Sequence, residues 1–290
     1  MTNACTGDLD TGFVTLGYGK VAFLGLVQGL SELMPISSTA HMRVVPALLG
    51  WTDPGSAFSA AMQLAALAAL AAYFRSDISG IVGGSVDALR RRDFADWDLR
   101  FAAYVILATI PIGVAGLLLS KTLNACNSPL RSLDVIGWSC IVMGLLLIAA
   151  ERIGRHLRQL VDVSLSDALI VGIAQVGALI PGVSRSGSTL TAARFLGFER
   201  QNAAYFSFLL GLPAIALAGL KELYELYKAH LDAHGWSVLA IGLVVGSLSA
   251  FAAIALLMRI LERFATWPFA VYRLLLGAVL LAGGAAGILH

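Results

Sequence analysis

Charge is scarce in this sequence. Asp, Glu, Lys and Arg make up 13% of its 290 residues, about half of their share in a typical soluble domain. This shortage excludes a disordered chain, a coiled coil and an ordinary soluble enzyme, all of which need more charged surface. The net charge of +2 gives no indication of a nucleic-acid partner.

Cysteine is scarce as well, and its three copies, Cys5, Cys126 and Cys140, do not have the spacing of metal ligands. We expect them to be isolated thiols. The first nineteen residues also have no Lys, no Arg and no apolar core. We therefore expect residues 1–19 to be an N-terminal extension and not a signal peptide.

Apolar residues are abundant instead. The set AVILMFWYC makes up 58% of the chain, and the mean hydropathy is +0.81. A helix that spans a bilayer core of ~30 Å needs about 20 apolar residues. Six stretches approach this length: Ala57–Phe74, Phe101–Ser120, Val135–Ala150, Ala203–Leu220, Trp236–Met258 and Pro268–Leu289. The sequence therefore predicts an all-α polytopic membrane protein with six transmembrane helices.

Two further apolar stretches, Val21–Leu30 and Ala168–Ile180, are too short to span. Each leads into a proline and then a segment rich in Ser and Thr, which can begin a new helix. We expect a re-entrant helical hairpin at each place. The hairpins read GLVQGLSELMPISSTAH from Gly25 to His41 and GIAQVGALIPGVSRSGST from Gly172 to Thr189.

The two hairpins look like copies, since Gly, Gln, Pro and a hydroxyl cluster recur in the same order. Chance similarity between apolar sequences is the alternative. Because three spans follow each copy, the second half would enter the membrane from the opposite face. The prediction is an inverted-topology repeat, with residues 20–150 as the first unit and 151–290 as the second.

Basic residues orient this topology. Eleven of them fall on one side and five on the other, so the first side is expected to be cytoplasmic. The first hairpin and both ends of the chain then face outward. We expect the run Arg90–Arg92 to be an orientation signal in a solvated loop. Cys5 and Cys126 share the outer side, which leaves a disulfide between them open.

Polar residues at membrane depth indicate the site. Glu32 follows Gln28 by one helical turn, so both lie on one helix face, and a carboxylate in a membrane needs a partner. These oxygens suit Mg²⁺ or Ca²⁺ if an anionic substrate completes the coordination shell. A glutamate that only reaches the membrane interface is the alternative.

Pro35 ends the first helix, and Ser37 or Ser38 can cap the next, whose free N–H groups attract phosphate. His41 lies one turn beyond. A Ser–His pair at this spacing can be a nucleophile with its base, or a base that activates water. A purely structural histidine is the alternative.

Arg185 lies in the second hairpin between apolar segments, where a charge is costly. Its guanidinium, the neighbouring hydroxyls and a new helix N-terminus would together form a phosphate cradle. An arginine that bonds the carbonyls of a broken helix is the alternative. Two hairpins from opposite faces would aim two positive helix ends at one point, which suits a pyrophosphate with a lipid tail.

The segments QGLSELMPISSTAH, from Gln28 to His41, and PGVSRSGST, from Pro181 to Thr189, resemble the two signatures of the undecaprenyl-pyrophosphate phosphatases of the bacitracin-resistance type. The resemblance continues in MQLAALAAL, FSFLLGLP and WPFAVYR. It implies a bacterial inner-membrane enzyme that converts undecaprenyl pyrophosphate to undecaprenyl phosphate and inorganic phosphate, and so recycles the lipid carrier of peptidoglycan synthesis. It also implies bacitracin resistance, a divalent metal, a homodimer and a site open to the extracytoplasmic side.

By this resemblance Glu32 holds the metal or its water, and Arg185 clamps phosphate oxygens. Ser38 and His41 match the proposed nucleophile and its activating partner. Gln28 stands where many members have glutamate, which puts its ligation of the metal in doubt. The remaining residues expected to bind substrate phosphate are Ser37, Thr39, Ser184, Ser186 and Thr189.

Two other functions share some of these features. The phosphatidic-acid phosphatase type needs a histidine six residues after the arginine of a Ser-Arg motif, and that position is Thr191 here. A lipid carrier or flippase for undecaprenyl phosphate would also use an inverted repeat with broken helices. Glu32, Ser38 and His41 supply more chemistry than a carrier needs, so hydrolysis is favoured.

Overall fold

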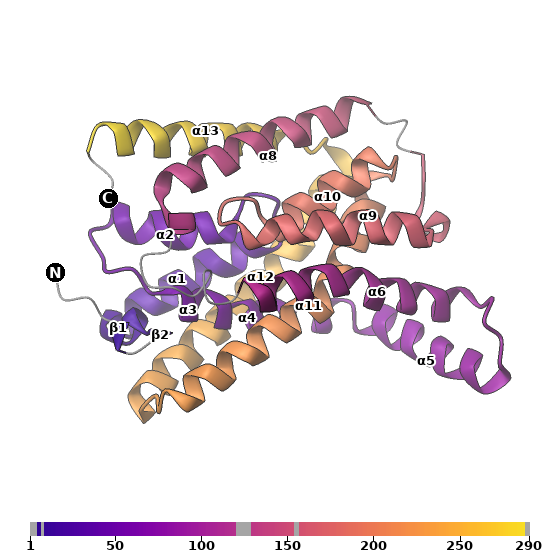
Figure 1. The fold of residues 1–290 in the computed structure, drawn as a ribbon, viewed down its shortest axis with the longest axis horizontal. Helices are drawn as coiled ribbons and strands as arrows, with labels where there is room; N and C mark the ends of the chain where they lie inside the picture. Colours follow the sequence, from indigo (N-terminus) through magenta and orange to yellow (C-terminus); the bar gives the residue numbers. More distant parts are fainter. Residues whose placement is uncertain (1–4, 7–8, 120–128, 154–156, 288–290) are drawn as a thin grey trace.

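The computed structural model describes residues 5–6, 9–119, 129–153 and 157–287 (Figure 1). Two short strands, β1 (Cys5–Thr6) and β2 (Leu9–Asp10), pair antiparallel. The other regular elements of the described chain are helices, and seven of them are long and apolar enough to cross a membrane. The all-α polytopic class is therefore confirmed.

Each of the six expected spans is mainly helical over its described residues. They correspond to α3 (Ser56–Ala61) with α4 (Gln63–Tyr73), α6 (Trp97–Leu118), α8 (Leu133–Ile153), α11 (Arg200–Lys228), α12 (Ala233–Arg263) and α13 (Trp267–Ala285). Several are longer than their apolar stretches because polar residues continue the helix at its ends.

A seventh helix is long enough to cross a membrane, so the number of six transmembrane helices stays a prediction. It consists of a 3₁₀ turn, η1 (Gly12–Leu16), and α1 (Gly17–Glu32), and together they are long enough to span. The apolar run Val21–Leu30 is by itself too short to span a membrane. The helix in fact begins before that run and continues through Ser31 and Glu32, both of which are buried.

Two pairs of helices reach the middle of the molecule from opposite ends (Figure 1). In the first pair, α1 leads through a turn into α2 (Ser38–Leu48). In the second, α9 (Leu165–Val176) continues as η4 (Gly177–Leu179) and leads into α10 (Arg185–Phe195). The two turns meet at the centre. The inverted repeat, with units 20–150 and 151–290, stays a prediction.

Glycines allow the helices of the two halves to pack closely. A Cβ atom added to Gly25 of α1 would lie 2.6 Å from the carbonyl oxygen of Gly242 in α12. A Cβ on Gly277 of α13 would lie 2.6 Å from the carbonyl oxygen of Gly137 in α8. Small residues at such crossings let helix backbones approach each other in a membrane, and the crossing with α12 fixes α1, which leads into the first turn.

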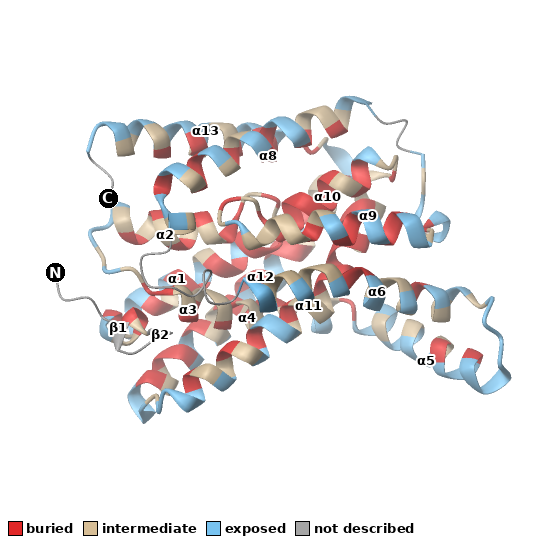
Figure 2. Ribbon diagram, viewed as in Figure 1, coloured by how far each residue is buried: buried red, intermediate tan, exposed pale blue. Residues whose placement is uncertain are grey.

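The run Arg90–Arg92, expected in a solvated loop, lies at the end of a helix, α5 (Arg75–Arg91), with Arg92 as its C-cap. Ser85 and Ala88 of this helix are buried, α5 packs against α6, and its last turn carries arginines that complement the helix dipole. Most of its surface is exposed (Figure 2). The charges of this segment therefore belong to an amphipathic helix. Its polar residues interrupt the apolar pattern that predicts a membrane span.

The expected N-terminal extension is partly packed against the core. Phe13 is fully buried and stacks on Phe58, with 5.1 Å between the ring centroids. Cys140 is a free, buried thiol, as expected. Cys126 lies outside the described residues, so the pairing of Cys5 with Cys126 stays open.

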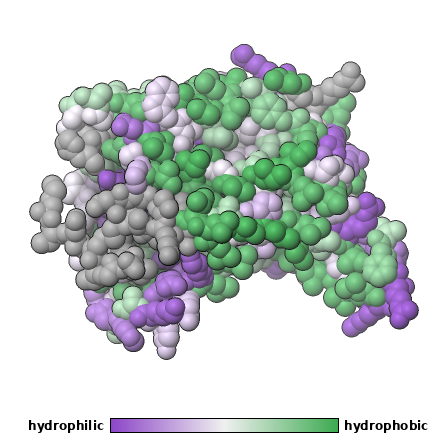
Figure 3. All heavy atoms as spheres, viewed as in Figure 1, coloured by the Kyte–Doolittle hydropathy of each residue, from purple (hydrophilic) through white to green (hydrophobic). Residues whose placement is uncertain are grey.

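The surface agrees with a membrane protein. Hydrophobic residues cover the middle of the face shown in Figure 3, and hydrophilic residues gather mainly toward its two ends, one of which is the tip of α5.

Candidate active site

Glu32 is at the centre of the site. It lies in the last turn of α1, is 6% exposed, and accepts hydrogen bonds from Gln28 Nε2 at 2.9 Å and Ser38 Oγ at 2.5 Å. Its other carboxylate oxygen lies 3.5 Å from Nη2 of Arg185. Glu32 and Arg185, the two charges that need partners at membrane depth, therefore pair with each other. Each hairpin supplies one of them.

Arg185 has unused hydrogen-bonding capacity. It is 9% exposed, and its Nε and Nη1 atoms are buried without a partner among the described residues. Buried N–H groups are almost always paired in folded proteins, so these two donors indicate a place for an anion. Gly211 of α11 provides the room, because a Cβ atom there would collide with Nη1.

The two turns have the same local structure. Ser37 and Ser184, which precede α2 and α10, both adopt positive φ, at 72° and 71°. Positive φ is uncommon for serine. Each side chain caps its helix: Ala40 N donates to Ser37 Oγ at 3.4 Å and Gly187 N donates to Ser184 Oγ at 3.1 Å. The expected capping is confirmed, and two helix N-termini point toward the centre.

The other hydroxyls bind the protein itself. Ser186 Oγ lies 3.0 Å from the carbonyl oxygen of Met34 and 3.2 Å from that of Glu32, so it joins the second turn to the first. Thr189 Oγ1 donates to the Arg185 carbonyl and accepts from Ser207 Oγ. Thr39 is half-buried at the start of α2. Phosphate binding by these residues stays a prediction.

His41 does not contact Ser38 in the described structure. Its Nδ1 lies 2.7 Å from the carbonyl oxygen of Ser37, and its Nε2 lies 2.6 Å from the hydroxyl of Tyr272. Ser38 turns toward Glu32 and the imidazole turns toward Tyr272 of α13. The roles of the two residues stay predictions.

Arg273 of α13 is a residue of the site that the sequence reading did not single out. It is 1% exposed, and its Nη2 donates to the carbonyl oxygens of Gly182 at 2.7 Å and Val183 at 3.0 Å. Its Nη1 donates to the carbonyl oxygen of Pro35 at 3.2 Å. One guanidinium thus joins both turns. The sequence feature that could have identified Arg273 is its position inside the apolar stretch Pro268–Leu289, where a charge is costly.

The donor set for a metal ion is small. The Oε1 atom of Gln28 is buried and has no partner among the described residues, and the Nε2 atom of the same amide donates to the Glu32 carboxylate. No group of three or more His, Cys, Asp or Glu side chains gathers anywhere in the described chain. Two such oxygens fit a hard cation that keeps waters or substrate oxygens in its shell, as Mg²⁺ commonly does.

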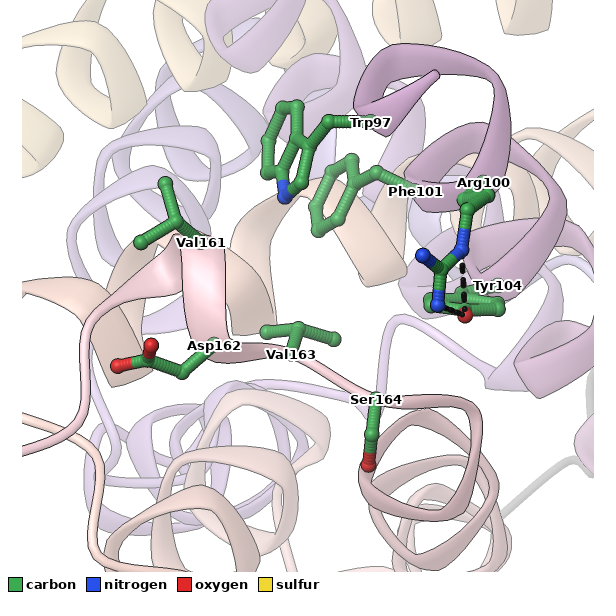
Figure 4. Close-up of a pocket in the computed structure, with 8 residues that line it drawn as sticks. All are labelled: Trp97, Arg100, Phe101, Tyr104, Val161, Asp162, Val163 and Ser164. Atoms are coloured by element: carbon green, nitrogen blue, oxygen red, sulfur yellow. Dashed lines mark hydrogen bonds between the residues drawn. The ribbon is translucent and has the colours of Figure 1, made fainter. Parts of the chain in front are cut away.

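A separate cavity of about 250 Å³ lies between the first turns of α6 and the segment before α9. Figure 4 shows Trp97 stacked on Phe101 and Arg100 bonded to the hydroxyl of Tyr104 on one side of it. It shares no lining residue with the site around Glu32.

Comparison with known proteins identifies the family. The family model described as "Bacitracin resistance protein BacA" matches residues 21–279. The chain belongs to this family. The two signatures recognised in the sequence are thus, in this BacA-family chain, the two turns that meet at Glu32 and Arg185.

Relatives of known name match almost the whole chain. Undecaprenyl-diphosphatase 2 of Mesorhizobium japonicum is 70% identical over 261 residues, which is 90% of this chain and 99% of the relative. The undecaprenyl-diphosphatase of Synechococcus elongatus is 49% identical over 268 residues, 92% of this chain and 93% of the relative. That of Gloeobacter violaceus is 48% identical and covers 94% of each chain.

Proposed function

We propose that this chain is a membrane phosphatase that hydrolyses undecaprenyl pyrophosphate to undecaprenyl phosphate and inorganic phosphate. The observation that carries the proposal is the buried contact between Glu32 and Arg185, with two donors of Arg185 left unpaired. The relatives are named undecaprenyl-diphosphatases, which supports undecaprenyl pyrophosphate as the substrate. In this role the enzyme returns the lipid carrier to peptidoglycan synthesis and confers resistance to bacitracin.

The two turns provide the binding site for the pyrophosphate. Arg185 offers Nε and Nη1 to phosphate oxygens, and a guanidinium fork matches two such oxygens at once. The N-termini of α2 and α10 add backbone dipoles of the same sign. The prenyl tail stays in the membrane, which the apolar surface of the chain contacts.

The Glu32 carboxylate and Nε2 of His41 are the two groups of the site that can take up a proton. Ser38 Oγ donates to Glu32 at 2.5 Å, so the proton can pass to Glu32 from Ser38 or from a water molecule in its place. The deprotonated oxygen bonds to the terminal phosphorus as the bond to the bridging oxygen breaks, and undecaprenyl phosphate leaves. If Ser38 is the attacking group, a water molecule then releases inorganic phosphate from it. Phosphoryl transfer depends on positioning and neutralisation of charge more than on a strong nucleophile. We therefore assign the main contribution to Arg185 and the helix ends.

Mg²⁺ or Ca²⁺ is the proposed cofactor, held by Glu32, Gln28 Oε1 and oxygens of the substrate. The cation would neutralise charge on the phosphates when bound. Gln28 in place of glutamate leaves one negative charge fewer at this position, so the cation depends more strongly on the substrate for its ligands.

We place the enzyme in the bacterial inner membrane, with the site open to the extracytoplasmic side, and as a homodimer. The excess of basic residues on the opposite side supports this orientation. The entry of the two hairpins from opposite ends supports the inverted-topology repeat (Figure 1).

The proposal is tested by measuring phosphate release from a prenyl pyrophosphate by the detergent-purified protein, with Mg²⁺, with Ca²⁺ and with excess chelator. We expect release that needs a metal and that Glu32→Ala and Arg185→Ala reduce at least 100-fold. Arg100→Ala, an exposed arginine outside the site, is the matched control and should keep its activity. Folded wild type that releases no phosphate with any metal contradicts the proposal, and a lipid-transport assay would then test the carrier alternative.

A further inference from the structure

His41 is held at both ring nitrogens. The carbonyl oxygen of Ser37, 2.7 Å from Nδ1, can accept a hydrogen bond but cannot donate one. Nδ1 therefore carries the proton, and in the neutral ring Nε2 is an acceptor. The partner of Nε2 at 2.6 Å is the hydroxyl of Tyr272, which donates to it. The two rings lie nearly parallel, with 6° between their planes and 5.7 Å between their centroids.

The site thus contains two separate chains of hydrogen bonds. In the first, Ser38 and Gln28 donate to Glu32. In the second, Tyr272 donates to His41, which donates to the backbone of the first turn. Tyr272 is 42% exposed and belongs to α13, from the other half of the chain. It is the outer end of the second chain.

We propose that Tyr272 is a positioning residue for His41: the Ser37 carbonyl sets the Nδ1–H tautomer, and the Tyr272 hydroxyl, by donating to Nε2, holds the imidazole turned toward α13. Nε2 is then the one ring nitrogen that can take a proton, and it faces Tyr272. The importance of this for turnover rests on the proposed phosphatase function. A hydrogen bond to one nitrogen commonly sets the tautomer and the direction of a functional histidine in this way.

The conservative variant Tyr272→Phe keeps the stacked ring and removes only the hydroxyl. The chain offers a matched control, because Tyr18 also pairs with a histidine: its hydroxyl lies 3.3 Å from His234 Nδ1, far from the site. Two quantities would be measured on the purified proteins. One is the ¹⁵N NMR spectrum of selectively labelled histidine, with His41→Gln used to assign the His41 signals. The other is kcat and KM for a prenyl pyrophosphate.

We expect wild-type His41 to be protonated at Nδ1 and to accept a hydrogen bond at Nε2. In Tyr272→Phe the Nε2 signal should lose its hydrogen-bond shift, while the Ser37 carbonyl keeps the proton on Nδ1. We expect kcat to fall about 10-fold or more, with KM changed less than about threefold, since positioned acid–base groups contribute factors of this size or larger. Tyr18→Phe should leave the His41 signals and kcat unchanged.

Three results overturn the proposal: a wild-type spectrum with Nε2 protonated, His41 signals that Tyr272→Phe does not change, or changed signals with an unchanged kcat. The spectrum is recorded without substrate. Inactive wild-type protein with the expected spectrum therefore contradicts the proposed function and leaves the assignment of the tautomer in place.

Discussion

At the scale of single residues, Gly211 determines where the Arg185 guanidinium can lie. Because a Cβ atom there would collide with Nη1, Gly211→Ala should push the guanidinium away from Glu32. We expect phosphate release to fall by roughly 10²–10³-fold, the usual effect of removing one preorganised donor to a developing oxyanion. Gly113→Ala, in a helix position with open space, is the control. Equal activities of the two variants would contradict this role for Gly211.

The residues of the site differ in how far the sequence could predict them. Glu32 and Arg185 were predictable, because a charge at membrane depth needs a partner and each hairpin supplies one. Gly211 and Arg273 were not, because their roles depend on side chains and carbonyl groups from distant parts of the chain. The hydrogen bond of His41 to Tyr272 was not predictable from spacing either, since Tyr272 lies 231 residues away in the sequence.

At the scale of helices, the close packing of α1 on α12 sets the position of Glu32. A Cβ atom on Gly29 would collide with the Gly246 carbonyl oxygen and would lie 2.7 Å from Ala250 N. Gly29→Ala should therefore move the last turn of α1, destabilise the protein by roughly 1–3 kcal/mol as overpacking does, and lower phosphate release at least 10-fold. Thermal unfolding in detergent and the activity assay would measure the two effects.

Gly19→Ala provides the control within the same helix, because nothing lies within 4 Å of the added atom. There the higher helix propensity of alanine should leave stability unchanged or slightly raised. If Gly29→Ala behaves in the same way as Gly19→Ala, the crossing of α1 and α12 does not position Glu32.

Helix positions followed from the sequence wherever apolar residues form a long run. The six expected spans are mainly helical over their described residues, because a helix satisfies every backbone hydrogen bond within the segment in lipid. The amphipathic α5 and the beginning of α1 were missed, since their polar residues break the apolar run but not the helix. Hydropathy alone therefore predicts spans better than it predicts where helices begin and end.

At the scale of the whole molecule, the topology can be tested at two exposed positions. Three long helices, α6, α8 and α11, and the α9–α10 pair lie between Arg91 and Lys228. If the α9–α10 pair is re-entrant, the chain crosses the membrane three times between Arg91 and Lys228, and the two residues lie on opposite faces. If α9–α10 crosses the membrane, four crossings place them on the same face. Arg91 and Lys228 have side chains that are 66% and 53% exposed, so a cysteine at either position would be reachable.

We expect Lys228→Cys, in a chain whose own cysteines are replaced by serine, to react with a membrane-impermeant maleimide in intact spheroplasts. Arg91→Cys should react only after permeabilisation, because the basic end of α5 belongs on the cytoplasmic side. Labelling of both variants in denaturant would control for expression, and phosphate release would show that each is folded. Labelling of both from one side would contradict the re-entrant pair. The reverse pattern would keep the repeat and would place the site on the cytoplasmic side, since the turn at Ser37 opens toward the same face as Lys228 in the predicted topology.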